Sequence, residues 1–328
     1  MKNLHSLLTL IVISISISFS SYGQTNGALG SNDSSLDMNK LLPKSGPNEQ
    51  CASDRRHEFL MANDPQYVAN RAKEEAHLQD VINNQIQTKA APPTYTIPVV
   101  VHVIHLGESV GSGTNISAAQ VQSAINNLTD AFGTSNTGTD TEIEFCLAVR
   151  DESGNPTTGI NRVDGSGTSD YSTQGITNDG GSSMNETTIK ALSKWDNSKY
   201  YNFWIVAGID GNMGGGGVQG YAYFPGAGSS VDGAVVLYNS FGYDPGGSIG
   251  YNLKSYTNYN ATTVHEMGHG LNLYHTFQGD GGGGSCPTNA SCGSSSDCCA
   301  DTDPHERAVT CGDTGNTCFG AGTDKADM

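Results

Sequence analysis

Three histidines and one glutamate fall within a single short run, and their spacing restricts how this part of the chain can fold. The run reads His265-Glu266-Met-Gly-His269-Gly-Leu-Asn272-Leu-Tyr-His275. On a helix, His265 and His269 are four positions apart, so both imidazoles project from one face. That spacing lets two ring nitrogens bind one zinc ion at about 2.0–2.1 Å each. The run therefore predicts a helix that presents two metal ligands.

The third histidine requires the chain to reverse. His275 follows His269 by six positions, and a continuing helix would carry it about 9 Å along the axis at 1.5 Å per residue. The helix must therefore end between the two, at a residue that tolerates positive φ. Gly270 and Asn272 both qualify, because glycine and asparagine accept the left-handed region most readily. The sequence leaves open which of them makes the turn.

The same residues indicate a chemistry. Three histidine ligands leave the fourth tetrahedral position for water, which is typical of a catalytic zinc site. Zinc lowers the pKa of that water to about 7 and polarises a substrate carbonyl. Glu266 points aside from the metal, so it can take the water's proton and pass it to the leaving amine. The run thus predicts peptide hydrolysis, with Glu266 as the catalytic residue and zinc held by His265, His269 and His275.

The N-terminus is typical of a secretory signal. Lys2 precedes an apolar run, Leu7 to Phe19, that is too short to span a bilayer comfortably, and Ser21-Tyr22-Gly23 forms a small-x-small cleavage site. We expect cleavage after Gly23, export from the cell and no stable membrane insertion afterwards. An uncleaved anchor is the alternative. Export permits disulfides, and six of the eight cysteines lie in the last 43 residues, at positions 286, 292, 298, 299, 311 and 318.

Charge and composition divide the chain near residue 90. Residues 90–328 hold 24 Asp and Glu against 8 Lys and Arg, whereas residues 1–89 hold 9 against 8. The net charge of −17 argues against nucleic acid or an anionic membrane as partner, because both recruit basic residues. The stretch Lys89-Ala-Ala-Pro-Pro93 breaks regular structure at the same place. We expect a signal over 1–23, a separate segment over 24–89 and the main domain over 90–328.

Apolar patterns in the main domain predict a mixed sheet with helices packed on it, an α/β (α+β) fold. Residues 97–104 are almost all apolar, as in a strand buried on both faces. Ser117 and Gln120 form a capping box that opens an amphipathic helix to about Phe132. Further strands are expected at 143–149, 201–209 and 233–238, and further helices at 64–86 and 185–195.

His265–His275 resembles the metzincin zinc signature HExxHxxGxxH, with Asn272 at the usual glycine. Residues Leu273–Gly279, the Cys-rich loops and Asp301–Pro304 resemble the pappalysin/cytophagalysin branch, which includes the ulilysin-like bacterial enzymes. The resemblance covers about residues 50–328. It implies a metzincin-type twisted mixed sheet with an active-site helix and an irregular, disulfide-rich C-terminal subdomain. It also implies zinc endopeptidase activity on protein or peptide substrates, a structural calcium site and latency conferred by a propeptide, here 24–89.

Two further sites follow from this resemblance. Asp301 and Thr302 could offer oxygen ligands to calcium; a solvated acidic loop is the alternative. Cys51 could fill the fourth zinc position as a thiolate, at about 2.3 Å, and so hold a zymogen inactive. The alternative for Cys51 is a disulfide to the body of the protein. Metzincins also carry a Met-turn after the third histidine. Met328 lacks the usual flank of that turn, so we expect a catalytic domain truncated at its C-terminus.

The remaining reactive residues have ordinary interpretations. His102 shares a strand face with apolar residues and is expected to be a satisfied core histidine. His57, His77 and His305 are expected at the surface, and Cys146 as a buried thiol in a strand.

Two other functions compete with a metzincin peptidase. A gluzincin-like enzyme would take a downstream glutamate as third ligand, and the only one after His269 is Glu306. A secreted binding or adhesion module could keep a non-catalytic zinc site.

Overall fold

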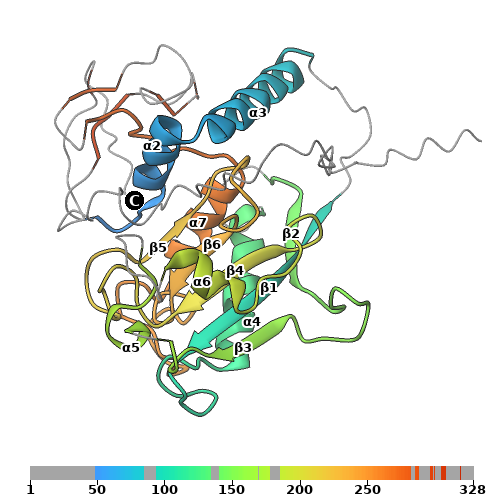
Figure 1. Cartoon of the computed structure of the whole chain (residues 1–328), viewed down its shortest axis with the longest axis vertical. Helices are drawn as coiled ribbons and strands as arrows, with labels where there is room; N and C mark the ends of the chain where they lie inside the picture. The colour runs from blue at the N-terminus through green and yellow to red at the C-terminus, as the bar shows by residue number, and fades with distance from the viewer. Residues whose placement is uncertain are drawn as a thin grey trace, which may run out of the picture. The chain divides into compact units, whose positions relative to one another are not determined.

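One central strand organises the sheet in this computed structural model. β1, Tyr95–His105, pairs in parallel with β2, Ile143–Leu147, along its first half and with β3, Ile160–Asp164, along its second half. On its other side it pairs with β4, Tyr201–Val206. The sheet continues through β6, Ala234–Leu237, to the antiparallel edge strand β5, Gly220–Ala222. The mixed sheet predicted from the sequence is confirmed (Figure 1).

The structure describes residues 49–84, 94–133, 140–168, 170–177, 185–281, 285–287, 296–297, 299, 304–307 and 318. All of them belong to one compact unit, Ser34–Met328. The predicted signal 1–23, the calcium candidates Asp301 and Thr302, and Met328 lie outside the described residues. Within the described part of the chain, no helix combines the length and apolar character needed to cross a membrane.

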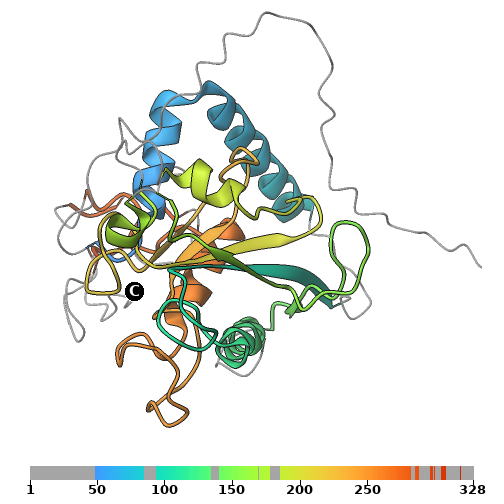
Figure 2. The same ribbon diagram turned by 60° about the horizontal axis from the view of Figure 1, so that its bottom comes forward.

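Two helices cover one face of the sheet. These are α4, Ala118–Phe132, and α7, Ala261–Gly270, which lie on the same side in Figure 2. Ser117 Oγ accepts a hydrogen bond from the Gln120 amide at 3.1 Å, so the predicted N-cap is present. Apolar side chains of α4 and α7 pack in one cluster with those of β1 and β4, among them Val121, Ile125, Leu128, Met267, Val99, Val101, Phe203 and Ile205.

Four helices lie on the opposite face. They are α2, Ser53–Asn63; α3, Pro65–Asn84; α5, Tyr171–Gln174; and α6, Glu186–Ala191. The second core cluster joins them to the sheet through Leu60, Tyr67, Tyr171, Ile189, Trp204, Tyr221 and Val235. We call residues 49–84 the N-terminal arm; its two helices lie over this face in Figure 2. The arm therefore shares a core with the domain that follows it.

The sequence located α3 correctly but not its buried face. Asp64 caps α3 as expected, with Oδ1 accepting from the Gln66 amide at 2.9 Å. Two of its apolar residues, Val68 and Val81, are 36% and 39% exposed. The buried side chains are Tyr67 and Arg71 instead. α3 packs on polar groups of the main domain. The spacing of apolar residues in a sequence cannot predict contacts of this kind.

Several single residues differ from expectation. His102 is a core histidine as predicted, with Nε2 at 2.8 Å from Asn202 Oδ1. His57 and His305 are buried rather than exposed, because each has a hydroxyl partner, Tyr67 and Thr276 respectively. Cys146 is an exposed free thiol, not a buried one, because alternate residues of β2 face outward. In the Cys-rich region a disulfide joins Cys286 and Cys318.

Candidate metal centre and catalytic glutamate

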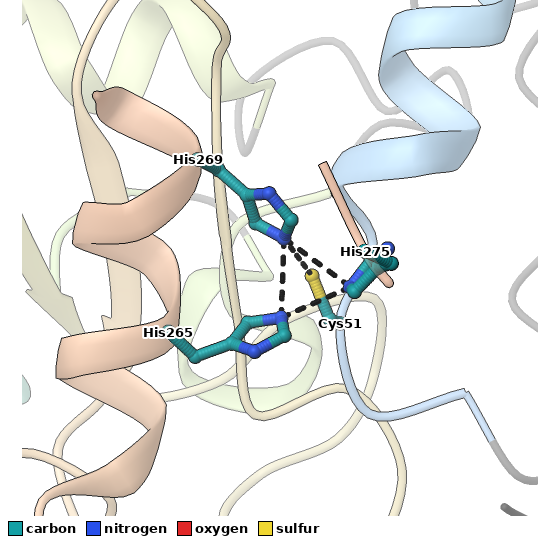
Figure 3. Close-up of side chains that lie close together, drawn as sticks. All are labelled: Cys51, His265, His269 and His275. Carbon is teal, nitrogen blue, oxygen red and sulfur yellow. Dashed lines mark hydrogen bonds between the residues drawn. The ribbon is translucent and has the colours of Figure 1, made fainter. Parts of the chain in front are cut away.

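Helix α7 carries two of the three histidines and is fixed by its neighbours. Asn260, which precedes the helix with φ 59°, donates from Nδ2 to the Ala124 carbonyl of α4 at 2.9 Å. Met267 is fully buried on the opposite side of the helix from the site. The helix therefore cannot rotate without breaking core contacts, and His265 and His269 are held facing the N-terminal arm (Figure 3).

The turn after α7 is a Schellman motif with Asn272 in the left-handed position. Asn272 has φ 78°. Its amide bonds to the His269 carbonyl at 2.9 Å, and the Leu273 amide reaches back to the Gly268 carbonyl at 2.9 Å. Of the two residues that the sequence left open, Asn272 makes the reversal and Gly270 stays helical. A Cβ on Gly270 would overlap the Tyr201 hydroxyl, so this position has to remain small.

The reversal brings all three imidazoles together. The Nε2 atoms lie 3.0 Å apart for His265 and His275, 3.1 Å for His265 and His269, and 3.2 Å for His269 and His275 (Figure 3). Cys51 Sγ lies 3.5 Å from the His269 Nε2. These four ligand atoms all lie within 4.8 Å of one another. Two nitrogens bound to one tetrahedral zinc at about 2.0–2.1 Å would be roughly 3.3 Å apart, which is close to the observed spacing.

The hydrogen bonds on the far side of the rings indicate that the cluster suits a cation. His269 Nδ1 lies 2.7 Å from the Leu273 carbonyl, and His275 Nδ1 lies 2.8 Å from Asp54 Oδ2. Both oxygens are acceptors, so each Nδ1 carries the proton and a neutral ring presents a lone pair at Nε2. Lone pairs that face each other at 3.2 Å repel unless a positive ion lies between them. The donor set therefore fits a bound zinc ion.

Burial keeps these rings in the neutral form that binds metal. Removal from water, with a smaller contribution from His275, lowers the pKa of His265 to about 3. The pKa of His269 is held well below its usual value for the same reasons. Metal binding needs deprotonated imidazole. The site is thus prepared for a metal ion at any pH near neutrality.

Glu266 is buried beside the cluster and is not one of its ligands. Its Oε2 accepts a hydrogen bond from Ser53 Oγ at 3.1 Å, while Oε1 has no hydrogen-bond partner among the described residues. Burial raises the pKa of Glu266 to about 8, and the bonds from Ser53 and Cys51 offset only part of that effect. A carboxyl group with a pKa near neutrality can both accept and return a proton, as a general base must.

Cys51 approaches the cluster from the N-terminal arm as a free thiol. The arm reaches the site by pairing with the edge strand: Cys51 forms a parallel bridge with Gly220, and the Ala52 amide donates to the Gly220 carbonyl at 3.2 Å. Burial, followed by the charge of Glu266, raises the pKa of Cys51 well above its usual value. A thiolate here therefore needs a cation beside it. The expected disulfide alternative is not the arrangement observed.

Three residues of the arm contact the site and were missed by the sequence analysis. Ser53 bonds Glu266, and Asp54 orients His275. Arg71 donates to Asn272 Oδ1 at 2.6 Å, and also to the Tyr274 hydroxyl and the Pro225 carbonyl. Ser53 and Asp54 lie two and three positions after Cys51, which was the only signal available for them. Arg71 lies 201 positions from Asn272, and no local pattern predicts such a pair.

The calcium prediction gains no support from the described residues. Asp280, an acidic residue five positions after His275, is buried and binds Arg307 through both carboxylate oxygens, each at 2.8 Å. Arg307 therefore already neutralises it.

Known proteases resemble this chain in both sequence and structure. The profile of the M43 peptidases, described as "Pregnancy-associated plasma protein-A", matches residues 183–326. Mature mirolysin of Tannerella forsythia, solved in complex with a cleaved peptide, is 31% identical over 66% of this chain and 74% of its own, with a TM-score of 0.50. The chain belongs to the pappalysin family of metalloproteases.

A second solved structure and two fungal proteins also resemble this chain. A promirolysin mutant of the same bacterium is 29% identical over 78% of this chain and 76% of its own, with a TM-score of 0.53. An extracellular metalloprotease of Pyricularia oryzae is 37% identical over 98 residues, which are 29% of this chain and 30% of that protein. One of Podospora anserina is 37% identical over 102 residues. The match thus spans under a third of these fungal relatives. The metzincin-type fold is confirmed by the structural likeness to mirolysin.

Proposed function

We propose that this pappalysin is a secreted zinc endopeptidase that is made as a zymogen and hydrolyses bonds in protein or peptide substrates. One observation carries the proposal: three histidine Nε2 atoms converge within 3.2 Å of one another, beside a buried carboxylate that takes no part in the cluster. Export is supported by the N-terminal pattern and by relatives named as extracellular metalloproteases.

Each residue has a definite task in this proposal. His265, His269 and His275 would hold zinc, and Asp54 and the Leu273 carbonyl fix two of their rings. Zinc, when bound, supplies a Lewis acid that polarises the substrate carbonyl and makes water more acidic. Glu266 accepts the proton of the attacking water at Oε1 and returns it to the leaving amine. Water cannot attack while the arm occupies this space, so the arm has to leave first.

Latency follows from where the arm places two side chains. Cys51 Sγ lies on the open side of the histidine cluster, and Ser53 Oγ donates a hydrogen bond to the Glu266 carboxylate. The Cys51 thiolate would complete a tetrahedral zinc site and exclude water, as the family resemblance implies. Cleavage within the linker, near Lys89, would release the arm.

Replacing Glu266 tests the catalytic assignment. We expect Glu266→Ala to retain zinc and fold while casein cleavage falls by about 10²–10⁴-fold or more, the usual contribution of a general base. His275→Ala should instead lose stoichiometric zinc. Glu306→Ala is the matched control, and it should cleave casein like the wild type. A Glu266→Ala protein that still cleaves casein rejects the assignment. A wild type that binds zinc but never cleaves favours the binding-module alternative.

A structural calcium site is a secondary proposal, supported by the family resemblance and by the acidity of the C-terminal loops. A ligand that binds only the folded state adds about 2.7 kcal/mol of stability at one hundred times its dissociation constant. We therefore expect selective calcium removal, with zinc retained, to lower thermal stability and increase self-cleavage. Asp301→Ala should reproduce that loss. If neither treatment changes the unfolding temperature, the calcium assignment is wrong.

A further inference from the structure

Asp54 of the N-terminal arm contacts the third histidine at the ring nitrogen that does not face the cluster. Its Oδ2 accepts a hydrogen bond from His275 Nδ1 at 2.8 Å, and the side chains of Asp54 and His275 are 20% and 4% exposed. The Nε2 atom of the same ring faces His265 and His269. The arm therefore fixes one of the three rings from outside the cluster and leaves its metal-binding nitrogen free.

The local structure of the arm brings Asp54 and Cys51 to the same place. Residues 50–52 run along β5, where Cys51 forms its bridge with Gly220, and α2 begins at Ser53. Asp54 lies in the first turn of α2, where the helix dipole favours a carboxylate. A change from extended chain to helix thus presents a thiol and a carboxylate, three positions apart, to the histidines.

Hydrogen bonds satisfy only half of the Asp54 carboxylate. Its Oδ1 is buried and has no hydrogen-bond partner among the described residues. A buried charged oxygen is costly unless an opposite charge lies close by. A histidine that binds a metal is neutral and cannot supply that charge. Zinc bound at the other nitrogen of the His275 ring can supply it, so Asp54 is suited to a site that holds a cation.

The charges of the arm match those of the metal. Zinc carries two positive charges, and the arm offers a thiolate at Cys51 and a carboxylate at Asp54, one on the histidine cluster and one directly behind it. A carboxylate that accepts the second N–H of a zinc-bound histidine orients the ring and makes it a better ligand. Loss of such a partner usually weakens metal binding about 10–100-fold. Both groups depart with the arm.

We propose that the arm secures zinc as well as blocking the site: Asp54 positions His275 and offsets the charge of the metal, so zinc is bound much more tightly before the arm leaves than afterwards. Zinc is then loaded in the latent chain, and the activated enzyme loses it to chelators more readily. Asp54 acts through His275 and is a positioning residue. This inference rests on the proposed function, because it requires zinc at the histidines and an arm that leaves.

Competition with a fluorescent chelator tests this proposal on the full chain with Glu266→Ala, which cannot cleave itself. We expect Asp54→Ala to raise the zinc Kd about 10–100-fold. Asp54→Asn keeps an acceptor for His275 Nδ1 without the charge, so its Kd should fall between those of Asp54→Ala and the parent. Glu58→Ala is the matched control, because it removes an exposed carboxylate one turn further along α2, and it should leave the Kd unchanged.

The same series in a Cys51→Ser background separates Asp54 from the thiolate. The ratio caused by Asp54→Ala should persist there. The double variant presents the three histidines without either group of the arm and should bind zinc most weakly. Thermal unfolding without zinc then distinguishes positioning from support of the fold. We expect Asp54→Ala to change the zinc-free unfolding temperature little and to reduce the increase that added zinc produces, because that increase depends on the Kd.

The outcomes distinguish this inference from the proposed function. A zinc Kd that Asp54→Ala leaves unchanged, or that Glu58→Ala raises equally, overturns the role of Asp54, and cleavage of casein by the wild type then still supports the peptidase. An equal loss of thermal stability with and without zinc also overturns it. A Kd that depends on Asp54 in a chain that never cleaves casein retains the inference and rejects the peptidase. A chain that binds no stoichiometric zinc rejects both.

Discussion

Helix α7 and the N-terminal arm meet at the same four ligand atoms, but they are attached to the molecule in different ways. α7 is part of the core, with Met267 fully buried among side chains of the sheet and α4. The arm buries a few apolar side chains, among them Leu60, but most of its named contacts are polar. Arg55 and Arg71 bind acceptors in the main domain, and the Arg56 guanidinium stacks on the Tyr221 ring. Contacts of this kind depend on pH, on salt and on the metal, whereas a core contact does not.

This difference indicates that the N-terminal arm can leave while the histidine cluster and Glu266 stay in place. When the arm leaves, the main domain keeps the three histidines and Glu266 but loses Asp54, the partner of His275. The arm on its own would lose most of the groups that satisfy its buried cations. We therefore expect the arm to be the less stable part. Elements that move in a switch generally open locally at a small free-energy cost.

The largest expected effect breaks the arm's hold on the metal centre. In Cys51→Ser the full chain should cleave casein at least about tenfold faster at early times, a change of ~1.4 kcal/mol or more. The reason is that a hydroxyl is a much poorer zinc ligand than a thiolate. Cys146→Ser, at the exposed thiol of β2, is the control and should remain latent. Equal latency of the two variants would show that Cys51 does not restrain the enzyme.

A smaller effect comes from the opposite end of the arm. Arg71→Ala removes donors to Asn272, Tyr274 and the Pro225 carbonyl, three half-buried acceptors. Hydrogen bonds to a charged group contribute about 1.5–3 kcal/mol, so the arm should open more easily by about 2–3 kcal/mol. Hydrogen exchange of arm amides in the Glu266→Ala background measures this opening. Glu74→Ala, at an exposed position of the same helix, should change this opening little. Equal exchange in both variants would mean that the Arg71 contacts do not hold the arm.

Acid should loosen the arm through His57. Burial, with a smaller effect of Arg71, lowers the pKa of His57 to about 4. Because this pKa is depressed in the folded state, the associated stability is complete above about pH 6.5 and is lost as the pH falls towards 4. At pH 5 the loss should be about 2 kcal/mol. His57→Gln should weaken this pH dependence of arm opening, measured by hydrogen exchange between pH 7 and 5. An unchanged slope would mean that His57 is not the sensitive group.

Local chemistry explains which parts of the molecule were predictable. The spacing of His265 and His269 predicted a helix, which is α7, and the need for a reversal before His275 reduced the turn to two candidates, of which Asn272 proved correct. The apolar run at 97–104 identified the central strand, because a strand that is buried on both faces is apolar along its whole length.

The rest depends on contacts between distant segments. The edge strand β5 has only three residues, and its importance comes from the arm that pairs with it. His57 was expected at the surface because a histidine in an isolated helix has no reason to be buried. Its burial is set by Tyr67, Phe224 and Tyr274, two of which lie more than 150 positions away. No periodicity in residues 53–84 could have indicated that surface.

The central claim is that the three histidines and Cys51 share one zinc ion in the latent chain. Zinc K-edge absorption spectroscopy on the full chain with Glu266→Ala tests it directly, because this variant cannot cleave itself. We expect three nitrogen neighbours at about 2.0–2.1 Å and one sulfur neighbour at about 2.3 Å, with the sulfur lost in the Cys51→Ser double variant. A spectrum with only nitrogen and oxygen neighbours, or a sulfur signal that survives Cys51→Ser, would contradict the account.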